Sequence, residues 1–416
     1  IKALALTPLQ TLRTAETMAS VQKNYLHQFE LKYGSNPHQK PAAIYSLDKE
    51  NFPFSVLNGQ PGYINLLDAI NAWQLVAELD EALGLPAATS FKHVSPAGAA
   101  VNVPLDETLR EVYGCKNQEL TPLATAYIRA RGADPLSSFG DFIALSRKVD
   151  VQTAEIIRKM VSDGIIAPDY DEDALKLLKE KKGGKYIILS ADPEFESPEL
   201  EFREVGGVVF SQLRNTIKIN EKSLLTEVVT KNTTLPEAAS RDLVLASITL
   251  KYTQSNSVAY ALDGQMIGIG AGQQSRVDCT KLAGRKADAW FLRQHPKARN
   301  LPFHEQVGSV ERTNARILCI EGGMTAPELR AWESLFKGPA EALSVIEKEE
   351  WLTKLAGVSL SSDAFFPFRD NIDQASKRGV HYVVQPGGSN RDEEVIAATD
   401  EYGMVMLFSG IRLFHH

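Results

Sequence analysis

Cysteine is scarce in this sequence of 416 residues, with only Cys115, Cys279 and Cys319, which are widely separated and odd in number. They supply neither a disulfide framework nor a Cys-x-x-Cys metal site, so we expect a protein of the reducing cytoplasm. Uncharged apolar runs are also short. The longest, Leu243 to Leu250, falls far below the roughly 20 residues that a membrane-spanning helix requires, and we therefore expect no membrane span.

Positive charge is not in excess either. Lysine and arginine number 45 against 52 aspartate and glutamate residues, which gives a net charge of −7. A general nucleic-acid-binding protein needs a basic surface that displaces counterions, so we expect no nucleic acid as partner. The hydrophobic fraction of 44% and the charged fraction of 23% are those of a globular protein. A chain of this length predicts two or three domains.

The first half of the chain shows the alternation of an α/β fold. Apolar residues recur every three or four positions from Asn65 to Leu83, and Gly84 follows, which predicts an amphipathic helix that ends there. The apolar segment Ala87–Phe91 then predicts a short buried strand. Polar loops and further helical segments follow, and this order of elements indicates the α/β class.

The second half repeats this alternation. The segments Ser257–Leu262 and Gln265–Ile269 predict two strands, and the Asp263-Gly264 pair between them is a strong hairpin signal. We expect the glycines of residues 268–272 to form a loop that leads into a helix near Arg276. Their Gly-x-Gly-x-Gly spacing does not match the dinucleotide-binding fingerprint, which leaves close backbone approach of some other ligand open.

Two polar segments mark boundaries of elements. Small residues at 387–390 precede the acidic residues of 391–394, a pattern that predicts a helix N-terminus. The charged segment 176–185, which includes Gly183-Gly184, is expected to be a surface connector near the middle of the chain.

The stretch Ser90–Gly98 is the most informative for chemistry. It places Lys92 and His93 at the carboxyl end of the predicted strand, before a break expected at Pro96-Ala97-Gly98, and open α/β sheets bind ligands at that end. Histidine suits a general base at neutral pH, although a lone histidine more often serves as a cap or in a core. Neighbouring strand residues point to opposite faces, so the two side chains share a site only if the strand ends between them.

Three further segments carry polar or aromatic groups in unusual density. Residues 252–257 could bind a carboxamide, a heterocycle or a desolvated monovalent cation, or could form an ordinary turn. Residues 361–371 place three aromatics between acids and an arginine, which resembles a pocket wall that presents a carboxylate. The apolar residues at 411–414 predict a buried C-terminus. A zinc deaminase would need a Pro-Cys-x-x-Cys motif, which is missing, so we expect no zinc.

Seven motifs in order closely resemble aminoimidazole carboxamide ribonucleotide (AICAR) transformylase, the formyltransferase part of the bifunctional purine-biosynthesis enzyme that also carries IMP cyclohydrolase. The resemblance extends from Leu31 to His416. The motifs are Tyr33-Gly34-x-Asn36-Pro37-His38-Gln39, Ser90–Gly98, Ser138–Asp141, Val161–Pro168, Thr253–Asn256, Phe365–Asp370 and Arg412–His416.

The resemblance implies an α/β fold of two cytidine-deaminase-like α/β/α units without zinc. We expect an N-terminal lead-in at 1–30, the first unit at 31–196 and the second at 197–416, with a soft boundary between them. It also implies a homodimer with active sites at the interface. Only about 30 residues precede the match, so we expect the cyclohydrolase domain to be absent from this chain. The chain would then be either a stand-alone enzyme, which the lead-in mildly favours, or the C-terminal part of a longer one.

The resemblance also implies the reaction. The 5-amino group of AICAR attacks the formyl carbon of 10-formyltetrahydrofolate, which gives formyl-AICAR and tetrahydrofolate in purine (IMP) biosynthesis. By position, His93 is the proton acceptor and Lys92 stabilises the transition state. The residues that would hold the nucleotide are Lys32, Tyr33, Gly140, Asp163, Asn256, Arg276, Phe365 and Arg412. Those that would hold the folate are Val277, Asp370, Ser389 and Asn390. We expect Ser389 and Asn390, at a helix N-terminus, to offer their backbone N–H groups to an acceptor. Potassium, which family members can carry, would be bound by oxygens of Thr253, Ser255, Ser257 and Asp363.

One residue departs from the pattern of the bifunctional enzymes, which have arginine where this chain has Lys32. Lysine keeps the charge but loses the bidentate fork that matches phosphate, so we expect nucleotide binding to be weaker by about 1–2 kcal/mol.

Two rival functions stay open from the sequence. An enzyme that uses another formyl donor, such as formyl phosphate, is disfavoured because no Gly-x-x-x-x-Gly-Lys-Ser/Thr loop is present. A catalytically silent purine-nucleotide-binding protein would have no need of the Lys92-His93 pair.

Overall fold

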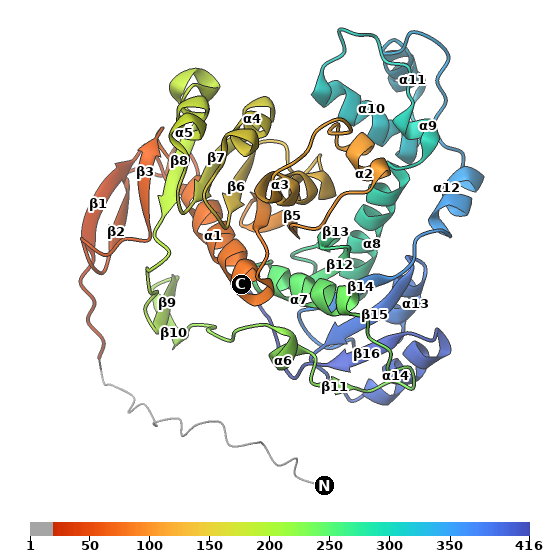
Figure 1. Ribbon diagram of the computed structural model, residues 1–416. Helices are drawn as coiled ribbons and strands as arrows, with labels where there is room; N and C mark the ends of the chain where they lie inside the picture. The colour runs from red at the N-terminus through yellow and green to blue at the C-terminus, as the bar shows by residue number, and fades with distance from the viewer. Residues whose placement is uncertain (1–19) are drawn as a thin grey trace. The chain divides into compact units, whose positions relative to one another are not determined.

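The computed structural model describes residues 20–416, which fall into an N-terminal unit that ends at Phe52 and a larger unit from Pro53 to His416 (Figure 1). In the N-terminal unit, strands β1 (Leu26–Leu31) and β2 (Ala42–Ser46) pair antiparallel. Strand β1 begins inside the segment that we predicted as a lead-in. The first 19 residues of that segment lie outside the described residues.

A mixed sheet of twelve strands forms the centre of the larger unit, in the order β11-β16-β15-β14-β12-β13-β5-β4-β6-β7-β8-β3. The strands of one half are β3 (Phe54–Asn58), β4 (Ala87–Lys92), β5 (Ser95–Val101), β6 (Asp141–Leu145), β7 (Ser162–Ala167) and β8 (Ile187–Ala191). Those of the other half are β11 (Glu227–Val228), β12 (Val258–Leu262), β13 (Gln265–Gly270), β14 (Val358–Ser362), β15 (Val380–Gln385) and β16 (Val405–Phe408).

Helices connect the strands of each half. In the first half these are α1 (Tyr63–Leu83), α2 (Glu107–Val112), α3 (Pro122–Ala133), α4 (Val151–Lys159), α5 (Glu172–Lys179) and the 3₁₀ turn η1 (Lys181–Gly184). In the second they are α6 (Glu221–Leu224), α7 (Glu237–Lys251), α8 (Arg276–Leu292), α13 (Asp370–Ser376) and α14 (Asp392–Glu401). The prediction of an α/β fold is confirmed.

The two halves of the sheet share one order of elements. In each, a long helix (α1 or α7) precedes an antiparallel hairpin (β4–β5 or β12–β13), and a helix then leads to a strand antiparallel to the first hairpin strand. Two further parallel strands and one antiparallel edge strand complete each half. The halves meet where β5 pairs with β13. The cytidine-deaminase-like character of each half stays a prediction.

Helix α1 shows why its apolar spacing and its final glycine predicted it correctly. Its buried positions include Leu66, Leu75 and Leu79, spaced as one face of a helix requires. Gly84 takes the left-handed conformation, with φ of 67°, and its N–H caps the carbonyl of Asp80. The predicted helix, its end and the following strand β4 are confirmed.

The glycine-rich stretch after the second hairpin is not the loop that we predicted. Gly268 and Gly270 belong to β13, and only Gly272, with φ of 65°, lies beyond it. A Cβ on Gly268 would lie 2.1 Å from the carbonyl oxygen of Ala283, and one on Gly270 2.6 Å from that of Cys279. The glycines therefore let α8 pack directly on the strand.

The charged segment 176–185 was expected to be a mid-chain connector. It forms the end of α5, then η1, and leads from β7 to the neighbouring strand β8 of the same sheet. It therefore joins adjacent strands within one half. The helix N-terminus predicted near residues 391–394 is confirmed, since α14 begins at Asp392.

Two groups of elements lie outside the order that the two halves share. Between α8 and β14, the helices α9 (Pro296–Arg299), α10 (Ser309–Glu321), α11 (Ala326–Glu333) and α12 (Val345–Leu352) form a group of their own (Figure 1). That group has a separate small core, which includes Trp332 and Phe336. Between the halves, β9 (Leu200–Val205) and β10 (Val208–Leu213) form an isolated hairpin. Within residues 20–416, we find no helix with the length and apolar character that a membrane crossing needs.

Candidate active site

The β4–β5 hairpin presents the predicted catalytic pair. Strand β4 ends at Lys92, and His93 and Val94 form a two-residue turn in which φ is 53° and 58°. The strand thus ends between Lys92 and His93, the condition for the two side chains to share a site. The break that we predicted at Pro96-Ala97-Gly98 is wrong, because these residues continue into β5.

The Lys92 ammonium is anchored on a neighbouring loop. It donates hydrogen bonds to the carbonyl oxygens of Phe139, at 3.1 Å, and Gly140, at 2.7 Å. Gly140 has φ of 70°, a conformation that favours glycine. His93 is exposed at the tip of the turn, whereas Lys92 is half-buried. The structure therefore brings Lys92 together with Gly140, one of the predicted nucleotide residues.

A buried polar network supports that loop from below. The Asp141 carboxylate accepts hydrogen bonds from Arg131 Nη1 and from Ser90 Oγ, both at 2.6 Å, and Ser90 also contacts Ser138. Complete burial raises the pKa of Asp141, and the Arg131 guanidinium opposes this rise. The motif 138–141 was recognisable in the sequence, whereas Arg131 was not, because its place on α3 gives no local signal of this contact.

A second carboxylate missed by sequence analysis lies behind the His93 turn. Asp68 on α1 is 5% exposed, and its Oδ1 accepts a hydrogen bond of 2.6 Å from the backbone N–H of Val94. Burial raises the pKa of Asp68, which the backbone bond to Val94 and the charges of His93 and Lys92 oppose. The only sequence signal is a charged residue on the apolar face of an amphipathic helix.

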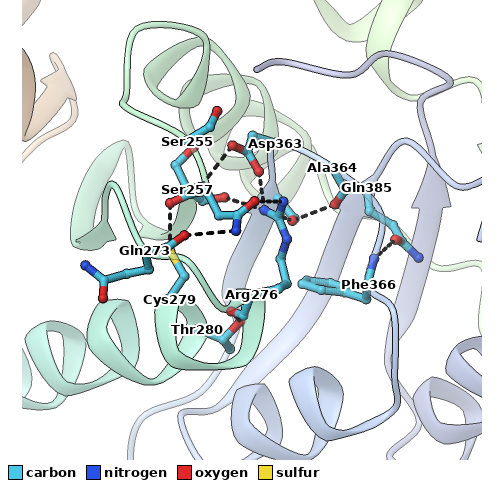
Figure 2. A network of polar contacts seen from close by, with 12 residues as sticks. Ser255, Ser257, Gln273, Arg276, Cys279, Thr280, Asp363, Ala364, Phe366 and Gln385 are labelled. Atoms are coloured by element: carbon cyan, nitrogen blue, oxygen red, sulfur yellow. Dashed lines mark hydrogen bonds and ion pairs between the residues drawn. The ribbon is translucent and has the colours of Figure 1, made fainter. Parts of the chain in front are cut away.

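Arg276 organises the second part of the site (Figure 2). Its guanidinium forms a buried ion pair with Asp363 and donates to Asn256 Oδ1 at 2.7 Å and to the carbonyl oxygen of Ser257 at 3.1 Å. Ser362 Oγ accepts a further bond. The guanidinium therefore joins α8, the 254–257 loop and the end of β14. A direct contact between Arg276 and a nucleotide stays a prediction.

The predicted potassium ligands come from three hydroxyl residues and one aspartate. Asp363 Oδ2 accepts from the Ser257 N–H at 2.9 Å, and Ser255 Oγ accepts from the His415 N–H at 3.0 Å. Thr253 Oγ1 donates to the Thr249 carbonyl at 2.7 Å. Within the described part of the chain, the hydroxyl of Ser257 is buried without a hydrogen-bond partner. This unpartnered hydroxyl oxygen is a candidate cation ligand.

Residues 20–416 contain no group of three or more histidine, cysteine, aspartate or glutamate side chains that could hold a metal ion.

The C-terminal residues dock against this loop. The Leu413 N–H donates to the Asp363 carbonyl at 2.8 Å, and the Ser255 N–H donates to the His415 carbonyl at 3.0 Å. Leu413 is buried, as predicted, whereas Phe414 is exposed. The Arg412 guanidinium is exposed and lies over the Phe414 ring, 4.8 Å from its centroid.

Three of the four predicted folate residues, Asp370, Ser389 and Asn390, lie in two segments that contact each other. Phe368, two residues before Asp370, lies under the Arg391 guanidinium at 5.0 Å from its ring centroid, which brings the 365–370 loop beside the segment that holds Ser389 and Asn390. We expected the backbone N–H of Ser389 to be free for a ligand, and this is wrong. It donates to Asp392 Oδ2 at 3.1 Å, as does the N–H of Gly388 at 2.7 Å.

The remaining predicted residues have separate surroundings. Val277 follows Arg276 on α8 and is half-buried, and Phe365 is 42% exposed. Asp163 on β7 pairs with Lys182 at 2.7 Å. Lys32 and Tyr33 belong to the N-terminal unit, directly after β1, and their place in the site stays a prediction.

The hairpin and the Arg276 network are in contact within the larger unit. The backbone N–H of Gln254 donates to Ser95 Oγ at 3.4 Å, at the start of β5. The first half of the sheet thus contributes Lys92, His93 and Gly140, and the second contributes the network around Asn256.

Comparisons with known proteins agree with the sequence motifs. Residues 5–286 match the family described as the AICARFT/IMPCHase bienzyme. Proteins named bifunctional purine biosynthesis protein PurH are similar along nearly the whole chain. The one from Elusimicrobium minutum is 33% identical over 389 residues, which are 93% of this chain and 58% of that protein. The one from Magnetococcus marinus is 34% identical over 409 residues, 95% of this chain and 61% of that protein. The chain therefore spans about three fifths of the length of these relatives.

Proposed function

The chain belongs to the AICARFT/IMPCHase bienzyme family, and on that premise we propose that it transfers the formyl group of 10-formyltetrahydrofolate to the 5-amino group of AICAR. The products are formyl-AICAR and tetrahydrofolate, in a step of purine biosynthesis. One observation carries the proposal: β4 ends between Lys92 and His93, so that an exposed imidazole follows directly on an anchored ammonium.

His93 acts as the general base. In the transfer, a bond forms between the amine nitrogen of AICAR and the formyl carbon, and the bond from that carbon to N10 of the folate breaks. The amine is conjugated with an electron-poor ring, so it is a weak nucleophile and must lose a proton as it attacks. The exposed imidazole of His93 takes this proton, which is then available for the departing N10.

Lys92 stabilises the negative charge that develops on the formyl oxygen in the tetrahedral intermediate. Two of its ammonium protons are directed at the carbonyl oxygens of Phe139 and Gly140. The third can be directed at the oxyanion. A cation held in advance by fixed hydrogen bonds needs little reorganisation when the charge appears, which makes it effective in a site that excludes water.

The remaining site residues bind the two substrates. The nucleotide is held by Asn256, by the loop that Arg276 organises, and by the cation Arg412 at its phosphate. Asp370 accepts hydrogen bonds from the donor nitrogens of the pterin. Because the N–H of Ser389 is used by Asp392, Ser389 binds the folate through its side chain, and Asn390 binds it alongside.

A potassium ion would be held by oxygens of Thr253, Ser255, Ser257 and Asp363. Its fit is supported by the buried, unpartnered hydroxyl of Ser257. When bound, the ion supplies positive charge that holds the 253–257 loop and thereby places Asn256.

A homodimer is the proposed assembly. The β9–β10 hairpin supports it, because six of its apolar side chains are each at least 45% exposed in the single chain. These are Leu200, Val205, Val208, Val209, Phe210 and Leu213. Large apolar side chains exposed in this number on one hairpin are typical of a protein–protein interface.

The deciding experiment follows tetrahydrofolate release spectrophotometrically, with the pure chain, AICAR and 10-formyltetrahydrofolate. We expect the wild type to turn over and His93→Ala to be slower by about a hundredfold or more, the scale of a lost general base. Nucleotide binding, measured by calorimetry, should fall less. His381→Ala, at an exposed histidine of β15, is the matched control and should keep full activity.

The outcomes separate the rival functions. Turnover with formyl phosphate in place of the folate would support the other donor. Binding of AICAR without turnover on any donor would support a silent binding protein. Unchanged turnover of His93→Ala would overturn the role of His93.

A further inference from the structure

The internal repeat places one aspartate at the same point of both halves. Asp68 is the sixth residue of α1 and Asp242 is the sixth residue of α7, and both are buried. Asp68 Oδ1 accepts a hydrogen bond from the N–H of Val94 at 2.6 Å, and Asp242 Oδ1 accepts one from the N–H of Gly264 at 2.7 Å. Each donor is the second residue of the hairpin turn that follows the helix.

The two turns differ in their need for this bond. Asp263 and Gly264, with φ of 49° and 71°, are residue types that such a two-residue turn favours. His93 and Val94 adopt the same left-handed region, which is an outlier for a β-branched residue such as valine. Residue preference therefore favours the left-handed conformation in the turn at Asp263-Gly264 and disfavours it in the turn at His93-Val94.

The charges around the two carboxylates differ as well. Asp242 is paired with its neighbour Arg241, whose Nη2 lies 3.0 Å from Oδ1. The equivalent position of α1 is Leu67, which has no charge. The groups that act electrostatically on Asp68 are instead Lys92 and, when it carries a proton, His93. In the first half, the carboxylate therefore faces the candidate catalytic pair.

We propose that Asp68 is a positioning residue of the transferase site. Its carboxylate accepts the Val94 N–H, holds the disfavoured turn in its left-handed conformation and so fixes His93 immediately beyond the end of β4. Asp242 forms the same contact in a half whose turn carries no catalytic group. This inference rests on the proposed function, because the role of His93 is part of it.

Activity measurements test the inference first. Asp68→Ala should lower kcat by about a hundredfold, the scale of a catalytic group displaced by an ångström, with a smaller change in KM for AICAR. Asp68→Asn keeps an oxygen that can accept the Val94 N–H and should retain most of the activity. Asp242→Ala is the matched control, and should lower thermal stability while leaving kcat within a few-fold of the wild type.

Rescue separates a local effect from general damage. Val94→Gly removes the side chain that makes positive φ unfavourable. In the Asp68→Ala background it should restore kcat at least several-fold, a result that a merely destabilised protein would not give. Wild-type kcat in Asp68→Ala would overturn the proposal, and so would a double variant that is no faster than Asp68→Ala.

Hydrogen–deuterium exchange provides a readout that is independent of the reaction. Asp68→Ala should accelerate exchange in the peptide of residues 91–97, and Asp242→Ala in the peptide of residues 262–267 only. If the wild type does not transfer formyl groups, the proposed function fails, while the exchange still decides whether Asp68 holds the turn. Unchanged exchange at 91–97 in Asp68→Ala would overturn the inference.

Discussion

The ammonium of Lys92 donates a hydrogen bond of 2.7 Å to the carbonyl oxygen of Gly140, and a Cβ on that glycine would lie 3.2 Å from the same nitrogen. The two residues come from different segments of the first half, Lys92 from the end of β4 and Gly140 from the loop before β6. Gly140 therefore accepts a bond from the ammonium and also leaves room for it. The close approach makes Gly140 a test of how strictly Lys92 must be placed.

Gly140→Ala is expected to lower kcat by about tenfold or more through displacement of the Lys92 ammonium. Left-handed alanine also costs roughly 1–2 kcal/mol of stability. Gly114→Ala is the matched control, because Gly114 has φ of 71° and open space around its Cβ. Steady-state kinetics and denaturant titration of both variants measure the two effects. An equal loss of kcat in both would show that contact with Lys92 is irrelevant.

Ser257→Ala tests the cation site. The wild type should melt at a higher temperature in potassium chloride than in choline chloride at equal ionic strength, since a ligand that binds only the folded state stabilises it. Ser257→Ala should lose this difference. Ser247→Ala, which removes a buried hydroxyl bonded to Ser361, should retain it. A wild type that melts identically in the two salts would contradict a potassium site.

The docking of the C-terminus should depend on pH through His415. Burial lowers the pKa of His415 below the ordinary value of about 6.5, and the charges of Glu201, His416 and Arg203 modify this shift. The unfolded chain then binds the proton more readily, so the contribution of His415 to stability is present above pH 6.5 and is lost as the pH falls below it.

His415→Gln removes this titration. We expect the unfolding free energy of the wild type to fall more steeply on acidification than that of the variant. The pKa of His295 is also lowered by burial, but it contributes equally to both proteins and cancels in the difference. Chemical denaturation across the range measures both curves, and parallel curves would contradict the prediction.

Phe210→Glu tests the proposed dimer surface. Phe210 is 60% exposed on β10, and a charge there should oppose burial of the apolar hairpin against a second copy. Light scattering after size exclusion should give twice the chain mass of 45.8 kDa for the wild type and a single chain for the variant. Val345→Glu is the control on α12, where Val345 is 68% exposed. A dimer that survives Phe210→Glu and dissociates with Val345→Glu would place the interface on the helical group instead.

Local sequence was sufficient where a feature depends on near neighbours. The helix that ends at Gly84 and the hairpin at Asp263-Gly264 were predicted because apolar spacing and turn residues act within a few positions. The motif around Lys92 and His93 was recognised in the same way. Even the condition that the strand ends between these two residues could be stated before the structure confirmed it.

Other features depend on contacts between distant segments. Gly268 and Gly270 looked like a loop because their local preference is for turns, yet the packing of α8 on β13 makes them strand residues. The N–H of Ser389 looked free because the sequence does not show that Asp392 turns back to accept it. Pro96 looked like a break, although the bulged pairing of β4 and β5 accommodates it.

The residues that support the site show the same division. The types and order of the motifs already identified the family. The contact of Asp68 with a turn 26 positions away, and that of Arg131 with Asp141 beneath the Lys92 loop, arise only when α1 and α3 pack on the sheet. Because these polar groups are buried, they can form hydrogen bonds only with partners inside the fold. Loss of either bond would therefore leave a polar group unpaired away from water, which lowers the stability of the folded state.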